Sequence, residues 1–125
     1  MAVAVMLGAL GAHALQKVLE PEQLQSFETG VRYQAWHALA LLAIQLIPPG
    51  WISSKTQLWT SRLMVGGIFA FSFSIYLLNL RELLGMPWAA PVLGPITPIG
   101  GLLLIAAWVL LAVGLLRRSS VKDTL

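Results

Sequence analysis

Few side chains in this sequence could do chemistry, and two histidines stand out among them. His13 and His37 could relay protons or share a metal ion, because imidazole titrates near neutral pH and ligates metals. The chain has no Cys, and its His and acidic residues match no recognised metal-ligand spacing. We find no Ser–His–acid or paired-carboxylate arrangement. We therefore expect no metal, no cofactor and no catalytic residue; hydrogen bonds between helices are the expected role of the histidines, with proton handling as the alternative.

Other polar side chains interrupt apolar segments, where each one is costly unless it is paired. One group lies within residues 31–47 and a second within residues 63–80. At about 100° per residue, the members of each group fall on one face of a helix. Such faces are typical of interhelical contacts. We expect a polar interior formed by His13, Gln34, His37, Ser72, Tyr76 and Asn79.

Two further patterns concern packing. Glu28 and Arg32 are one helical turn apart with the acid first, which favours an ion pair worth about 0.2–0.5 kcal/mol at a surface. Small residues recur at helical spacing in the first and last apolar segments, and small residues let membrane helices approach closely. The expected helix-packing positions are Gly8, Ala12, Gly100, Gly101, Ala107 and Gly114.

Four apolar segments must position these residues. A bilayer core of about 30 Å requires about 20 apolar residues in a helix, and the expected spans are 1–19, 31–47, 63–80 and 96–116. Pro48-Pro49-Gly50 ends the second span, because proline cannot continue a helix. Thr97-Pro98 predicts the start of the fourth, with Thr as N-cap. Residues 21–28 predict a short amphipathic helix on the membrane surface between the first two spans.

The composition agrees with a membrane protein. Of the 125 residues, 58% are hydrophobic and 10% are charged, and the mean hydropathy is +0.80. Soluble domains are about 45–50% apolar and about 25% charged, and a chain of this size cannot bury so much apolar surface. These values argue against a soluble enzyme, a disordered chain and a nucleic-acid-binding domain. We expect one integral membrane domain over residues 1–125, with the lipid bilayer as its partner.

The positions of lysine and arginine predict the orientation. Cytoplasmic loops carry an excess of these residues. If both termini are cytoplasmic, three cations lie outside, namely Lys17, Arg32 and Arg81. Five then lie inside, namely Lys55, Arg62, Arg117, Arg118 and Lys122. The excess favours cytoplasmic termini.

Four strings of residues resemble a known family. They are GALGAHAL at 8–15, FETGVRYQ at 27–34 with HALALL at 37–42, FSFSIYLL at 71–78 and ITPIGG at 96–101. Together they are similar to the YgdD-like family, a domain of unknown function found in small bacterial inner-membrane proteins. The resemblance implies four transmembrane helices and an inner-membrane or equivalent location. It implies no reaction.

These observations predict an all-α fold, a four-helix transmembrane bundle with antiparallel neighbours. The expected function is non-enzymatic: a structural, membrane-integrity or accessory role through helix packing, either with itself as a homo-oligomer or beside a larger membrane complex. The alternative is a small oligomeric transporter or proton-coupled channel, lined by the polar side chains of the second and third spans.

Overall fold

Helices make up the regular structure of the part of the chain described by the computed structural model, which covers the backbone of residues 1–122 and the side chains of residues 1–117. The α-helices are α1 (Ala2–His13), α2 (Pro21–Gln45), α3 (Ser54–Ile68), α4 (Ser74–Leu80) and α5 (Ala90–Lys122). A π-helix, Phe69–Phe73, joins α3 to α4 in one continuous run. Two 3₁₀ turns, Leu15–Lys17 and Pro87–Ala89, lie in connections. The described residues contain no strand, so the fold is all-α, as the sequence predicts.

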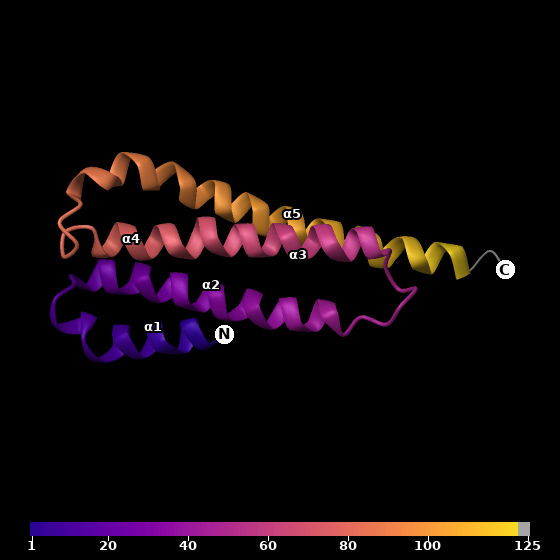
Figure 1. Ribbon diagram of the computed structural model, residues 1–125, viewed down its shortest axis with the longest axis horizontal. Helices are drawn as coiled ribbons and strands as arrows, with labels where there is room; N and C mark the ends of the chain where they lie inside the picture. Colours follow the sequence, from indigo (N-terminus) through magenta and orange to yellow (C-terminus); the bar gives the residue numbers. More distant parts are fainter. Residues whose placement is uncertain (123–125) are drawn as a thin grey trace.

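Because α3, the π-helix and α4 form one continuous helical rod, the helices make four antiparallel rods. Figure 1 shows α1 beside α2, and α2 beside the α3–α4 rod. The α5 rod packs along the other side of α3 and α4. α5 ends at one end of the molecule, whereas α1 starts near the middle of its length and runs in the opposite direction to α5 (Figure 1).

Local signals explain where α2 and α3 begin. At α2, the side chain of Glu20 accepts from the N3 backbone while Gln23 accepts from the Glu20 backbone N–H at 3.1 Å, and proline fills the first helical position. At α3, Ser53 Oγ accepts from the Thr56 backbone N–H at 3.0 Å. Between these helices, Gly50 has a φ of +83°, which glycine adopts without steric cost.

Two expected boundaries are wrong. Residues 21–28 form the first two turns of α2 and not a separate surface helix. The capping box at Glu20 starts a helix that runs without interruption to Gln45. The last rod starts at Ala90, not at Thr97, and passes through Pro95 and Pro98. A proline removes one backbone donor, and packing against neighbouring helices makes that loss tolerable in a membrane helix.

Two helical stretches are long and apolar enough to cross a membrane, by length and composition. They are Ser54–Leu80, with 27 residues, and Pro87–Arg117, with 31 residues. The first rod, Ala2–Lys17, is apolar but shorter. The α2 helix is long, and its first half carries Glu22, Glu28 and Arg32, which lower its hydropathy.

Small residues bring α5 against the α3–α4 rod. A Cβ added to Gly100 would lie 2.7 Å from backbone atoms of Ala70 and Phe71, in the π-helix. A Cβ on Gly67 would lie 2.6 Å from Leu104, and one on Gly114 would lie 2.8 Å from the Thr56 side chain. These contacts lie at positions 100, 104 and 114 of α5, so the two rods touch along much of their length. Ala107 is fully buried in the same seam, in a core cluster with Ile44, Met64 and Leu111.

The first rod packs along a different line from the expected one. Ala4, Gly11 and Leu15 are buried, and a Cβ on Gly8 would touch Val31 at 3.5 Å. Ala12, an expected packing residue, is exposed. Most contacts of α1 are with α2, and a narrow stripe at alternating three- and four-residue spacing is enough for them. Leu7 and Leu15 also belong to a core cluster that includes Tyr76 and Leu80 of α4.

Candidate functional site

His37 lies at the centre of the polar interior. Its side chain is only 6% exposed. Nδ1 is 2.7 Å from the Tyr33 carbonyl oxygen, and Nε2 is 3.2 Å from the indole nitrogen of Trp108. An indole nitrogen can only donate, so Nε2 accepts and Nδ1 carries the proton that it donates to Tyr33. Each ring nitrogen therefore has a hydrogen-bond partner within the chain, one as donor and one as acceptor, as in a neutral imidazole.

Tyr76 and Gln34 make the second contact of this interior. The Tyr76 hydroxyl donates to Gln34 Oε1 at 2.7 Å, joining α4 to α2. The Tyr76 ring packs on the ring of Phe27, with 5.0 Å between centroids. Gly30 makes room for this ring, because a Cβ there would lie 2.8 Å from Tyr76. The glycine thus allows α2 and α4 to approach closely enough for the hydrogen bond.

Asn79 makes the third contact, one turn further along α4. Its amide nitrogen donates to Ser26 Oγ at 3.0 Å and to the Ile75 carbonyl at 2.8 Å. The Ser26–Asn79 pair ties the first turns of α2 to the end of α4. Together with Tyr76–Gln34, it fixes the register of these two antiparallel helices.

A fourth contact joins α4 to α5 beside the π-helix. The Ser74 hydroxyl is 2.7 Å from the Thr97 hydroxyl, and it also donates toward the carbonyl oxygens of Ala70 and Phe71. A π-helix leaves carbonyl groups without their usual i+4 donors, and Ser74 partly satisfies them. Ser72 is also buried here, 1% exposed, and faces α2.

Of the expected interior residues, four come together, one lies nearby and one lies apart. Gln34, Ser72, Tyr76 and Asn79 lie at the junction of α2 with the α3–α4 rod. His37 lies on α2 where this helix meets α5, at Trp108. His13 is exposed at the end of α1, away from the others. It lies on the side of α1 opposite to the stripe that packs on α2.

The expected ion pair does not form among the described residues. Both Glu28 and Arg32 are exposed, and the Arg32 guanidinium instead donates to Thr29 Oγ1 at 3.0 Å. Elsewhere within the described residues, an ion pair joins Arg81 to Glu82 at 3.2 Å. No group of three His, Cys, Asp or Glu side chains close enough to hold a metal is found within the described residues.

Several hydrogen-bond partners found in the structure were not among the expected interior residues. Ser26, Thr97 and Trp108 pair with interior side chains. Gln57 donates to the Ile44 carbonyl at 2.9 Å, and Gln45 donates to Ser61 at 3.2 Å. Polar residues near helix ends look like surface residues in a sequence, and only the register between helices shows which of them have partners inside.

A cavity borders this polar interior. Its volume is about 440 Å³, and it lies between α1 and the α3–α4 rod. Gln34, Ser72 and Tyr76 form one wall, and apolar side chains that include Val3, Leu7 and Phe73 form the rest. The cavity is mostly apolar, because Gln34 and Tyr76 direct their polar atoms toward each other.

Comparisons with known proteins identify the family. The family described as "Protein of unknown function (DUF423)" matches residues 7–101. The chain belongs to this family. The "UPF0382 membrane protein SSP2132" of Staphylococcus saprophyticus is 39% identical over 115 residues, covering 90% of this chain and 86% of the relative. The "UPF0382 membrane protein YwdK" of Bacillus subtilis is 37% identical over 114 residues, covering 89% and 85%.

A third family member is the "UPF0382 inner membrane protein YgdD" of Escherichia coli. It is 37% identical over 113 residues, covering 90% of this chain and 80% of the relative. The family resemblance predicted from the sequence is therefore confirmed, and the relatives are named as membrane proteins of an uncharacterised family. No solved structure matches this chain.

Proposed function

We propose that this member of the DUF423 family is a four-span protein of a bacterial inner membrane or an equivalent membrane. In this proposal it acts without catalysis, as a structural or accessory protein that packs with itself or beside a larger membrane complex. Support for the membrane location comes from the two long apolar stretches and from the names of the relatives. The apolar first rod and the length of α2 support the two further spans.

The observation that carries the structural role is that three pairs of interior polar side chains are hydrogen-bonded within the chain, although the buried Thr60 and Ser72 hydroxyls have no hydrogen-bond partner among the described residues. His37 binds Trp108, Tyr76 binds Gln34, and Asn79 binds Ser26. In hydrocarbon, such bonds replace the hydrogen bonds that water would supply. Side chains that line a transport path must instead be free to exchange partners with an ion or a substrate. The interior therefore supports helix packing better than conduction.

Both termini are proposed to be cytoplasmic. α1 and α5 run in opposite directions, as the first and last of an even number of spans do, although α1 starts near the middle of the molecule's length (Figure 1). Lys55, Arg62 and Arg117 belong to that end. The side chains of Arg118 and Lys122, which contribute to the expected charge excess, lie outside the described residues. Because the chain has no Cys, single cysteines at the termini or in the 48–53 connection would report the orientation by labelling in intact cells.

A transporter or proton-coupled channel is the second candidate, because the 440 Å³ cavity reaches Gln34, Ser72 and Tyr76. Flux measurements in proteoliposomes separate the two candidates. We expect vesicles that contain the chain to hold a pH gradient as well as empty vesicles, and His37→Ala to change nothing. A proton or solute flux that His37→Ala abolishes would overturn the structural role. Gentle purification from the native membrane would then identify the proteins that accompany the chain.

A further inference from the structure

Two opposite charges lie unpaired on the outer face of α2. Glu28 and Arg32 are one turn apart and exposed, yet they make no ion pair with each other or with another group in the part of the chain that the structure describes. The Arg32 guanidinium uses one donor on Thr29 Oγ1, at 3.0 Å. Its other N–H groups and the Glu28 carboxylate remain available. In a membrane-spanning helix, an ionisable side chain without a partner is costly and points to a function.

A hollow lies beside these charges, between α1 and α2. Its volume is about 240 Å³. The exposed Glu28 and Arg32 line it together with residues that carry no polar side chain, namely Leu7, Gly8, Gly11, Phe27 and Val31. The two glycines keep it open, because side chains at these positions would begin in van der Waals contact with Val31 and Phe27, at 3.5 Å. The site therefore presents one negatively charged side chain, one positively charged side chain and an apolar surface.

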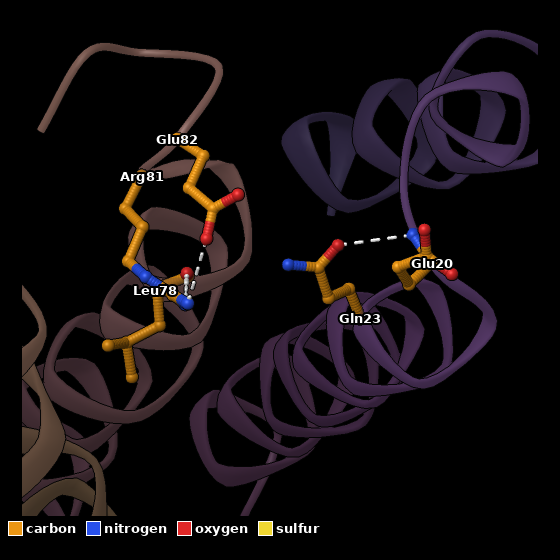
Figure 2. A network of polar contacts seen from close by, with 5 residues as sticks. All are labelled: Glu20, Gln23, Leu78, Arg81 and Glu82. Carbon is orange, nitrogen blue, oxygen red and sulfur yellow. Dashed lines mark hydrogen bonds and ion pairs between the residues drawn. The ribbon is translucent and has the colours of Figure 1, made fainter. Parts of the chain in front are cut away.

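Hydrogen bonds between helices show at which level along the bundle this hollow lies. The Asn79–Ser26 bond puts Ser26 level with Asn79. The Arg32 guanidinium lies at Thr29, only about 4.5 Å further along α2 at about 1.5 Å per residue. Arg81 reaches back to the Leu78 carbonyl at 2.5 Å, so its guanidinium also lies near the Asn79 level (Figure 2).

The same end of the molecule carries the start of α2. Figure 2 shows Glu20 and Gln23 in their capping contact opposite Arg81 and Glu82. Charged groups thus gather at this end on both helices. When the chain is inserted as proposed, Glu28 and Arg32 lie at the border between lipid headgroups and hydrocarbon, where long charged side chains reach toward the interface.

We propose that this hollow binds one phospholipid whose headgroup carries both a phosphate and a primary ammonium. Arg32 binds the phosphate, since a guanidinium presents several donors to phosphate oxygens. Glu28 accepts hydrogen bonds from the ammonium, and the glycerol region and first acyl carbons rest against Gly8 and Gly11. This inference depends on the membrane insertion proposed above.

The opposite charges of Glu28 and Arg32 make the site selective among phospholipid headgroups. A phosphoethanolamine headgroup supplies a negative group for Arg32 and three N–H donors for Glu28. A choline headgroup has a cation without N–H groups, so it cannot donate to Glu28. A phosphoglycerol headgroup has no cation, which leaves Glu28 unpaired. A second copy of this chain could also supply opposite charges to Glu28 and Arg32, and the experiment below includes that outcome.

The test measures lipid binding to the purified full-length chain in detergent, by native mass spectrometry. Phosphatidylethanolamine, phosphatidylcholine and phosphatidylglycerol with identical acyl chains are titrated separately. We expect the ethanolamine lipid to bind about tenfold more tightly than the choline lipid, a difference that one charge-assisted hydrogen bond can produce. Equal binding of all three lipids to the wild type would overturn the proposal.

Variants assign the effect to the two charges. Glu28→Gln should remove the preference for ethanolamine over choline, whereas Arg32→Gln should weaken binding of all three lipids about tenfold. Gly8→Leu should fill the hollow and weaken binding while both charges remain. The matched controls are Glu82→Gln and Arg117→Gln, which change exposed charges elsewhere and should leave binding unchanged. Circular dichroism confirms that each variant is folded.

Two further outcomes count against the proposal and are distinguishable. If the preference persists in Glu28→Gln, the headgroup binds elsewhere. If the wild type has the mass of two chains, and Glu28→Gln and Arg32→Gln have the mass of one, a second copy occupies the hollow. Proton flux in proteoliposomes is measured separately, so a failure of the proposed structural role does not alter the lipid result. Release of the chain from membranes by alkaline carbonate would overturn membrane insertion and the lipid site together.

Discussion

The indole nitrogen of Trp108 on α5 donates a hydrogen bond to Nε2 of His37 on α2, at 3.2 Å. These residues are 71 positions apart in the chain. The rest of the indole is partly exposed, with 46% of the residue accessible, so Trp108 has its polar edge inside and its apolar edge toward the surroundings. This bond is the polar link between the second and the last rod, and it fixes the tautomer of His37.

Replacing His37 tests how much this hydrogen bond contributes to the stability of the protein. His37→Leu leaves the Trp108 N–H without its acceptor and the Tyr33 carbonyl without the side-chain donor. We expect a loss of about 1–3 kcal/mol in the free energy of unfolding, measured by thermal or denaturant unfolding in detergent. His13→Leu is the control, because His13 is exposed and the structure gives it no partner among the described residues. Equal stability of His37→Leu and the wild type would show that the contact with Trp108 is absent.

Two adjacent glycines on α5 should respond in opposite ways to alanine. A Cβ on Gly100 would lie 2.7 Å from backbone atoms of the π-helix, and backbone cannot move aside as a side chain does. We expect Gly100→Ala to destabilise the protein by about 1–3 kcal/mol through overpacking. At Gly101 the nearest atom is a Phe71 ring carbon at 3.7 Å, so alanine fits.

Gly101→Ala is therefore the matched control for Gly100→Ala. Alanine is favoured over glycine in a helix by about 0.8–1.0 kcal/mol in soluble hosts, so we expect this variant to be as stable as the wild type or slightly more so. Thermal unfolding of the two purified variants checks both expectations. If Gly100→Ala is the more stable of the two, the close approach of α5 to the π-helix is not present.

The Tyr76–Gln34 bond can be measured by a double-mutant cycle. Tyr76→Phe removes the hydroxyl and keeps the ring on Phe27, so the cost should be about 0.5–1.5 kcal/mol. Combined with Gln34→Ala, the coupling energy should be near the value of about 0.6 kcal/mol typical of such bonds in membranes. A coupling indistinguishable from zero would mean that the two side chains do not interact.

The start of α3 offers a test outside the apolar region. Ser53→Ala removes the oxygen that accepts from the Thr56 backbone N–H, and we expect a loss of about 1 kcal/mol. Ser54→Ala, one position later, changes a similar hydroxyl that has no role in the cap and should have little effect. Chemical denaturation of both variants in the same detergent provides the measurement. Similar losses in the two variants would argue that α3 starts elsewhere.

Sequence patterns alone were enough to predict the all-α fold class and the family. Apolar run lengths give the rods, since a helix in hydrocarbon must satisfy its backbone internally. Periodicity places Gln34 with His37, and Ser72 with Tyr76, on one face of each helix, because side-chain direction along one helix is a local property. The small residues on α5 were found for the same reason: Gly100, Ala107 and Gly114 repeat every seven positions.

Which of these side chains meet depends on how the helices pack in three dimensions. Trp108 and Thr97 became partners of His37 and Ser74 through the register between α5 and the other rods, and no pattern within one helix contains that register. Arg32 bonded to Thr29 instead of Glu28, because an exposed helical ion pair is worth less than about 0.5 kcal/mol and local geometry easily overrides it. Pro98 did not start a helix, since packing against the π-helix holds α5 together across it. Contacts between distant residues depend on distances in three dimensions, which periodicity along the chain does not encode.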